Sequence, residues 1–221
     1  MRFGVLADIH GNLPALEAVL EALGPVDGLL CAGDIVGYNP WPGECVERVR
    51  ELDAVTVRGN HDRAVAFDGG ERFNWMASAG VDYAREVLDD DAIAWLRSLP
   101  TEAFVANGRV HIVHGHPDDP DRYTYPREFS ASMLGEGIEV LICGHTHVQG
   151  TRRFDDGIVF NPGSVGQPRD GDPTAAFAVL DLDGEPSVDQ RRVEYDIDRV
   201  IEAVEEAGLP TKIGTRLVSG N

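Results

Sequence analysis

The chain begins with an alternation of apolar runs and helix-period segments, and this pattern restricts the fold more than any other feature. Apolar runs at 2–7, 28–34 and 54–60 predict buried strands. Between them, the segment 13–23 carries its apolar residues at helical spacing, and 42–52 also predicts a helix. Because strand–helix–strand units form parallel sheets covered by helices, this part of the chain predicts an α/β fold.

Two helices are expected in 74–99, and the pattern changes after Pro100. The segment 102–116 predicts two strands around an Asn-Gly turn, a strong hairpin signal. Further strands are expected at 138–147, 157–164, 175–184 and 186–196, with a closing helix over 196–207. We therefore expect a single domain over 1–221, with a parallel first half, a more antiparallel second half, and two sheets packed together between helices.

Residues that commonly bind metals follow the predicted strands. Asp8 and His10 come after the first strand, and side chains two positions apart on a strand point the same way. Ligands of α/β sheets bind at the carboxyl ends of the strands, so residues at these ends should converge on one rim. The full set of candidate metal ligands is Asp8, His10, Asp34, Asn60, His114, His145 and His147.

Seven donors are too many for one tetrahedral zinc site. They suit two divalent ions that share a carboxylate and leave space for water. Imidazole and oxygen donors without thiolate favour transition metals over calcium. We expect manganese first, with iron, zinc, cobalt or nickel as alternatives.

The strings "DIH", "GD", "GNHD", "HGH" and "GHTH" occur here in the order found in calcineurin-like metallophosphoesterases, between residues 8 and 147. "NPGS" at 161–164 also resembles that family's loop after the last ligand strand, and the opening "DIHGNLPAL" resembles its small bacterial and archaeal phosphodiesterase branch. The resemblance implies a four-layer α-β-β-α sandwich with two packed mixed β-sheets flanked by helices.

The resemblance also implies a role for each ligand. One metal would be held by Asp8, His10 and His147, and the other by Asn60, His114 and His145. Asp34 would bridge the two ions.

Two further residues would act directly in the reaction. Two cations ~3.5–4 Å apart would clamp a phosphoryl group and lower the pKa of a bridging water, and the resulting hydroxide would attack phosphorus. His61 would protonate the leaving oxygen, a step worth roughly 10²–10⁴ in rate, and Asp62 would orient His61. Asn12, Arg58 and His116 lie near the expected rim and are candidate substrate contacts.

The sequence therefore predicts a phosphoesterase that depends on two metal ions, with diesters favoured over monoesters. The alternative is a scaffold on the same fold that acts through protein partners. A scaffold should lose ligands or the acid, whereas every such position is filled here. A zinc hydrolase of another bond, such as a lactamase-like enzyme, would need an HxHxDH cluster, which the sequence lacks.

The net charge of −19 restricts the partners. Carboxylates occur all along the chain and Lys212 is the single lysine, so the surface should repel nucleic acid and anionic membranes. We expect a small phosphorylated substrate. Adaptation to high salt is a hypothesis that explains the charge, because the Debye length falls to ~3 Å at 1 M salt.

The remaining composition favours a cytoplasmic protein. No apolar stretch approaches the ~18–20 residues of a membrane span, and the first residues lack a cationic and apolar signal segment. The three cysteines are scattered without CxxC spacing, so we expect Cys31 and Cys143 to be small buried core residues. The sequence leaves the oligomeric state open.

Overall fold

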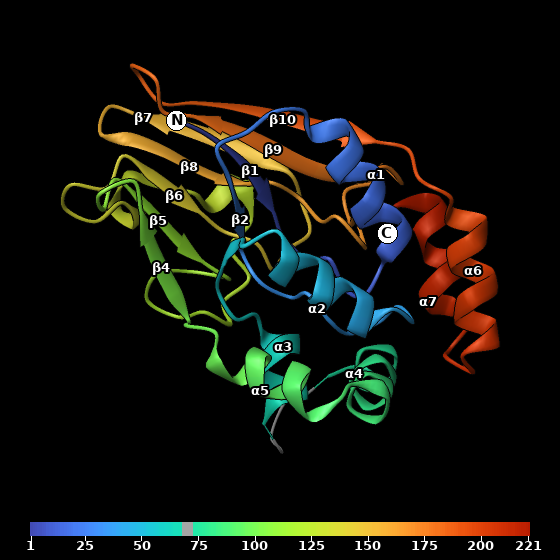
Figure 1. Ribbon diagram of the computed structural model, residues 1–221. Coiled ribbons are helices and arrows are strands. Elements are labelled where there is room, and N and C mark those ends of the chain that lie inside the picture. Colours follow the sequence, from blue (N-terminus) through green and yellow to red (C-terminus); the bar gives the residue numbers. More distant parts are fainter. Residues whose placement is uncertain (68–72) are drawn as a thin grey trace.

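The computed structural model describes residues 1–67 and 73–221, and in this part of the chain two mixed five-stranded sheets pack face to face (Figure 1). The first sheet has the order β10-β9-β1-β2-β3 and the second has the order β4-β5-β6-β8-β7. The strands of the first are β1 (Arg2–Leu6), β2 (Gly28–Cys31), β3 (Val55–Thr56), β9 (Ala175–Asp181) and β10 (Ser187–Val193). Those of the second are β4 (Glu102–Val105), β5 (Val110–Val113), β6 (Val140–Ile142), β7 (Gly150–Phe154) and β8 (Gly157–Asn161).

The helices of the described residues flank this sandwich. They are α1 (Leu13–Leu23), α2 (Pro42–Glu51), α3 (Asn60–Ala66), α4 (Trp75–Val87), α5 (Asp90–Ser98), α6 (Ile197–Glu206) and α7 (Lys212–Thr215). Three short 3-10 helices span Pro126–Glu128, Ala131–Met133 and Arg216–Ser219. The predicted α/β sandwich of two mixed sheets between helices is confirmed.

The strands alternate their side chains between two apolar layers. Val5 and Leu30 of the first sheet meet Ile112 and Ile142 of the second in the layer between the sheets. On the other side of the first sheet, residues such as Leu6 pack against α1 and α2. This period-two alternation is what allows one sheet to bury both of its faces.

The outer face of the second sheet has a thinner cover. Phe129 and Met133, from the segment with two 3-10 helices, pack on Val113, Leu141 and Val159. A loop with single helical turns therefore supplies most of this fourth layer.

The first half of the chain forms parallel strand pairs and the second half is more antiparallel, as expected, but the two halves do not form one sheet each. β9 pairs with β1 and β10 pairs with β9, both antiparallel, so the last two strands complete the first sheet. In the second sheet, β5, β6 and β8 are parallel and the antiparallel strands β4 and β7 form its edges. The strand β7 was not expected, because its middle residues are exposed and polar.

The third strand is also shorter than expected. β3 covers two residues, and Asn60 begins α3 instead of ending a strand. Gly59 is the N-cap residue of α3, and its N–H donates to the Asp62 carboxylate at 3.0 Å. This helix start places Asn60 and His61 at the rim of the sheet.

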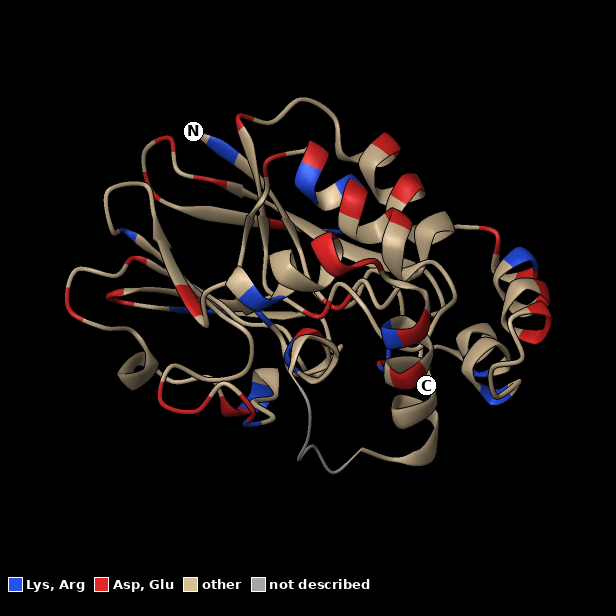
Figure 2. Ribbon diagram, turned by 60° about the horizontal axis from the view of Figure 1, so that its bottom comes forward, with Lys and Arg blue, Asp and Glu red and all other residues tan. Residues whose placement is uncertain are grey.

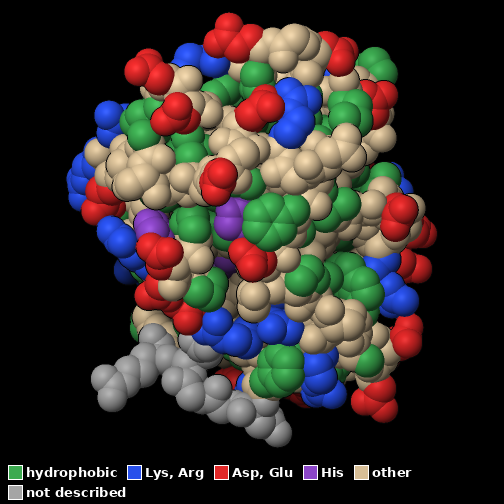
Figure 3. All heavy atoms as spheres, turned by 90° about the vertical axis from the view of Figure 1, so that its left-hand side faces the viewer, with side chains coloured by type: hydrophobic (Ala, Val, Ile, Leu, Met, Phe, Trp, Pro, Cys, Tyr) green, Lys and Arg blue, Asp and Glu red, His purple; other side chains and the backbone are tan. Residues whose placement is uncertain are grey.

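Acidic side chains are distributed over the molecule. They occur along several helices and in many loops (Figure 2). On the face shown in Figure 3 they are scattered among arginines and hydrophobic groups and do not gather into one patch. Among the described residues, no helix has the length and apolar character that a membrane crossing requires.

Candidate metal centre

The structure brings the predicted metal ligands together at the carboxyl ends of strands from both sheets. Asp8 and His10 follow β1, and Asp34 follows β2. The other four follow β3, β5 and β6, and are Asn60, His114, His145 and His147. Two groups, each with ligand atoms within 4.8 Å of one another, are Asp8–His10–His147 and Asp34–His114–His145.

Five of these residues have a backbone conformation that is uncommon outside glycine. Their φ angles are 53° at Asp8, 50° at His10, 56° at Asp34, 68° at His145 and 59° at His147. Such left-handed residues cost about 1–3 kcal/mol each and gather at functional sites, where Asp and His adopt them more readily than most residues. The donors are therefore aimed by tight turns after the strands, and not by a shared strand face as the i, i+2 spacing suggested.

Each of the four histidines predicted as ligands has its outer ring nitrogen within hydrogen-bond distance of a backbone carbonyl. A carbonyl oxygen can only accept, so each of these nitrogens carries the ring proton. The pairs are His10 Nδ1 with Val36 O (3.1 Å), His114 Nδ1 with Ala32 O (2.8 Å), His147 Nδ1 with Gln167 O (2.6 Å) and His145 Nε2 with Asp121 O (3.0 Å). In the neutral rings the inner nitrogens therefore present lone pairs to the centre, as metal-binding histidines do.

The inner nitrogens lie in pairs. His10 Nε2 is 3.0 Å from His147 Nε2, and His114 Nε2 is 3.0 Å from His145 Nδ1. Two facing lone pairs repel at this distance unless a cation or a proton lies between them. Metal–nitrogen bonds of about 2.0–2.1 Å place neighbouring ligands close to this separation. The geometry fits a divalent ion at each pair.

Asp34 lies between the two pairs. Its Oδ2 is 3.7 Å from His10 Nε2 and 3.4 Å from His114 Nε2, while its Oδ1 accepts the His61 N–H at 2.8 Å. Asn60 adds an oxygen to one side, because its Oδ1 is 3.1 Å from His114 Nε2. A single carboxylate oxygen is thus within reach of both groups.

Burial sets the electrostatics of the centre. It raises the pKa of Asp8 to about 8, and it lowers the pKa values of His10 and His147 well below the usual range. Burial also opposes protonation of His114, but the charge and hydrogen bond of Asp34 outweigh it and raise the His114 pKa to about 10. A proton on His114 thus supplies positive charge where a cation would otherwise lie.

His61 is buried against the same centre. Its ring lies between Tyr38 and Phe73, with centroids 4.8 and 4.6 Å away, and is edge-on to His10 at 4.7 Å. One ring nitrogen of His61 is within 4.8 Å of side-chain atoms of His10 and Asp34 that could bind a metal. The Nδ1 atom of His61 is buried and has no hydrogen-bond partner among the described residues. Burial lowers the pKa of His61 to about 4.

The resemblance implied that Asp62 orients His61, and the hydrogen bonds of the Asp62 carboxylate run to the backbone. This carboxylate accepts four backbone N–H groups, and among the described residues it has no hydrogen bond to the His61 ring. The donors are Asp34 N (2.8 Å), Ile35 N (2.8 Å), Val36 N (3.2 Å) and Gly59 N (3.0 Å). Asp62 points toward the start of its own helix, so it fixes the backbone that carries Asp34 and His61.

The three expected substrate contacts have structural partners. The Asn12 side chain caps α1, Arg58 donates toward α5, and His116 stabilises its own loop. Their hydrogen bonds are Asn12 Oδ1 from Ala15 N (3.2 Å), Asn12 Nδ2 to Gly166 O (2.9 Å), Arg58 Nη1 to Arg97 O (2.9 Å) and His116 Nδ1 from Asp118 N (3.1 Å). Among the described residues, His116 belongs to none of the groups of converging histidine and carboxylate atoms.

The "NPGS" loop supports the centre from behind, a role that the sequence argument did not assign to individual residues. Asn161 Nδ2 donates to Gly144 O at 2.6 Å and to Thr146 Oγ1 at 3.1 Å, beside the two histidines that follow β6. Ser164 Oγ donates to the carbonyl of Asp8 at 2.7 Å. The "NPGS" motif is the sequence feature from which a role for Asn161 and Ser164 could have been predicted.

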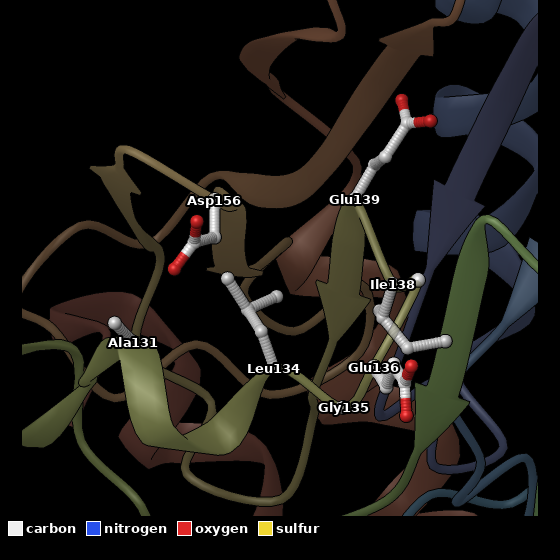
Figure 4. Close-up of a pocket in the computed structure, with 8 residues that line it drawn as sticks. Ala131, Leu134, Gly135, Glu136, Ile138, Glu139 and Asp156 are labelled. Carbon is white, nitrogen blue, oxygen red and sulfur yellow. The ribbon is translucent and has the colours of Figure 1, made fainter.

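A separate surface hollow of about 470 Å³ lies at the opposite ends of the strands (Figure 4). Glu139, which precedes β6, and Asp156, which precedes β8, line it together with Glu136 and Leu134. It has no histidine or cysteine, and its Glu139 is already paired with Arg109. This hollow does not resemble a transition-metal site.

Comparisons with known proteins agree with this geometry. The model of the calcineurin-like phosphoesterase superfamily domain matches residues 1–185. An uncharacterized protein of Methanocaldococcus jannaschii is 32% identical over 98% of this chain and 97% of its own, and phosphodiesterase YfcE of Escherichia coli is 28% identical over 83% and 89%. The crystal structure of a metallophosphoesterase from Sphaerobacter thermophilus superposes with a TM-score of 0.88 and 36% identity, covering 100% of this chain and 99% of that one.

Proposed function

Because the chain belongs to the calcineurin-like phosphoesterase superfamily, we propose that it is a dinuclear-metal phosphoesterase that hydrolyses small phosphodiesters. The observation that carries the proposal is the pair of facing imidazole contacts at 3.0 Å, one on each side of Asp34. The name of the relative YfcE supports diesters as the substrate class.

The residues fit two ions. Asp8, His10 and His147 would hold one, Asn60, His114 and His145 would hold the other, and Asp34 would be shared. Manganese suits this mixture of oxygen and imidazole donors, as do iron, zinc, cobalt and nickel. When bound, such ions polarise phosphoryl oxygens and lower the pKa of water.

His61 would donate a proton to the leaving oxygen. Its position beside His10 and Asp34 supports this role. The low pKa that burial gives the ring means that it is neutral near pH 7 in the metal-free protein. A negatively charged phosphoryl group beside the ring favours the imidazolium, so the substrate itself would help to bring the acid into its active form.

Asp62 and the loop 34–36 would hold the His61 ring and the Asp34 carboxylate in their positions relative to one another. The four N–H groups that Asp62 accepts tie this loop to the first turn of α3. Asp62 is therefore a positioning residue in this proposal. Removing its carboxylate would leave several buried N–H groups without an acceptor, a penalty of about 1–3 kcal/mol for each group.

The test compares metal content and turnover. After loading with manganese, metal analysis should find close to two ions per chain, and hydrolysis of bis-p-nitrophenyl phosphate should exceed that of p-nitrophenyl phosphate. Chelation should abolish both reactions, and manganese should restore them. A fully loaded protein that hydrolyses neither ester would favour the alternative of a metal-carrying scaffold.

A further inference from the structure

Arg169 lies beside the metal centre in a setting unlike that of a surface arginine. Its backbone N–H donates to the carbonyl of His147 at 3.2 Å. Its guanidinium lies over the ring of Tyr38, 5.7 Å from the ring centroid. Tyr38 in turn packs its ring against His10 and His61, at 4.9 and 4.8 Å. The cation is thus placed next to one metal-ligand group and the proposed acid.

The hydrogen-bond partners of this guanidinium are uncharged. Gln167 Oε1 accepts from Nη2 at 2.7 Å and from Nε at 3.2 Å, and the Tyr38 hydroxyl accepts from Nη2 at 3.2 Å. In the described part of the chain no carboxylate forms an ion pair with it, although the protein has 38 acidic and 19 basic residues. Arg109, by contrast, makes two hydrogen bonds to Glu139.

The charge of Arg169 also acts on a second arginine. After burial, it is the largest cause that lowers the pKa of Arg216. A cation whose hydrogen-bond partners are uncharged, next to a group of candidate metal ligands, leaves a place where an anion would be stabilised.

Gln167 provides a second, independent observation. It is fully buried, and its carbonyl oxygen accepts from His147 Nδ1 at 2.6 Å while its side-chain oxygen holds Arg169. Its Nε2 has no hydrogen-bond partner among the described residues. An unsatisfied buried amide is costly in a folded protein, so an acceptor supplied by a ligand explains it.

We propose that Arg169, oriented by Gln167 and Tyr38, binds a non-bridging oxygen of the substrate's phosphoryl group. The inference rests on the proposed function and assigns to that site a substrate-binding cation supplied by the chain itself. The guanidinium presents several N–H donors in a planar fork that matches phosphate oxygens, and lysine would offer only a point charge. Inorganic phosphate is the smallest ligand with the required chemistry.

The test uses three variants of the manganese-loaded full-length chain. Arg169→Gln removes the charge, and Arg169→Lys keeps it without the fork. Arg153→Gln is the matched control, because it removes the same charge from an exposed arginine paired with Glu185. Orthophosphate affinity is measured by calorimetry, bound manganese by elemental analysis, and KM and kcat with bis-p-nitrophenyl phosphate.

We expect Arg169→Gln to weaken orthophosphate binding about 10- to 100-fold, the range for loss of a charged hydrogen bond, and to raise KM by a similar factor. Arg169→Lys should fall between this variant and the wild type, and Arg153→Gln should stay within about two-fold of the wild type because exposed ion pairs contribute little. Bound manganese should be the same in all four proteins.

The inference is overturned if Arg169→Gln binds orthophosphate as tightly as Arg153→Gln, if it loses manganese, or if the loaded wild type binds no orthophosphate. The proposed function fails separately. A wild type that binds orthophosphate through Arg169 but hydrolyses no ester would contradict the proposed phosphoesterase activity. The proposal that Arg169 binds an anion would still hold.

Discussion

Gly37 offers a sharp test of the position of His61. Its φ is +90°, and a Cβ placed there would lie 2.4 Å from His61 Nδ1 and 3.1 Å from its Cγ. Alanine at this position must therefore displace the imidazole. Gly108 is a matched control, because its φ is +85° and a Cβ there would meet no atom within 4 Å. Gly108→Ala carries the backbone strain without the clash.

Both variants should lose stability to backbone strain, and they should differ greatly in activity. A left-handed alanine costs about 1–2 kcal/mol, which lowers the Tm of a domain of this size by about 2–8 °C in either variant. Moving the buried imidazole adds about 1–3 kcal/mol in Gly37→Ala. Displacing the acid should reduce kcat by up to about 10²–10⁴ in Gly37→Ala alone. The loss should be greatest for an alkyl phosphodiester, because a poor leaving group depends most on protonation.

The measurement is kcat for an aryl and an alkyl phosphodiester, with melting curves and metal content for both variants. Unchanged metal content with a selective loss on the alkyl ester would support the acid role of His61. If Gly37→Ala matched Gly108→Ala on both esters, the imidazole would not need its present position and the assigned role would be wrong.

Four further predictions follow from the same contacts. His61→Ala should retain manganese and lose most turnover, whereas Asp34→Asn should lose both. Full turnover in His61→Ala would show that His61 is not the general acid. Asn161→Ala removes three buried hydrogen bonds, so urea unfolding should show a loss of about 3 kcal/mol, and a loss near zero would contradict its supporting role. Asp8, with a pKa of about 8, and His114, with a pKa of about 10, bind protons at pH 7 without metal. Metal must displace these protons, so affinity should rise with pH and calorimetry in buffers of different ionisation enthalpy should detect proton release. Melting in low and molar salt tests the high-salt hypothesis, and equal stability in both would count against it.

The local structure was largely predictable, whereas the pairing of the strands was not. The helix expected over 13–23 and the Asn-Gly hairpin occur in the structure because each depends on residues close together in the sequence. Nothing local shows that β9 pairs with β1, since an apolar strand can bury its faces in either sheet. The polar strand β7 lacked the apolar signal altogether, because it lies at an edge of its sheet.

In the candidate site too, features that depend on neighbouring residues could be predicted and contacts between distant parts of the chain could not. The convergence of the candidate ligands could be predicted because Asp, Asn and His recur at the ends of several strands. The true partners of Asp62 could not be predicted, since they depend on the helix α3, which is separated by three residues from the end of the short strand β3. Arg169 could not be found either, because its setting depends on Tyr38, which is 131 positions away in the chain.

The left-handed backbone at Asp8, His10, Asp34, His145 and His147 affects how substitutions there should be interpreted. Alanine at any of the five deletes a donor and keeps an unfavourable turn, so an alanine scan would confuse lost coordination with lost folding. Asparagine tolerates this conformation, and glycine relaxes it. A glycine variant should therefore be more stable than the wild type in the absence of metal, because it removes the backbone strain that holds these side chains in position before any ion binds.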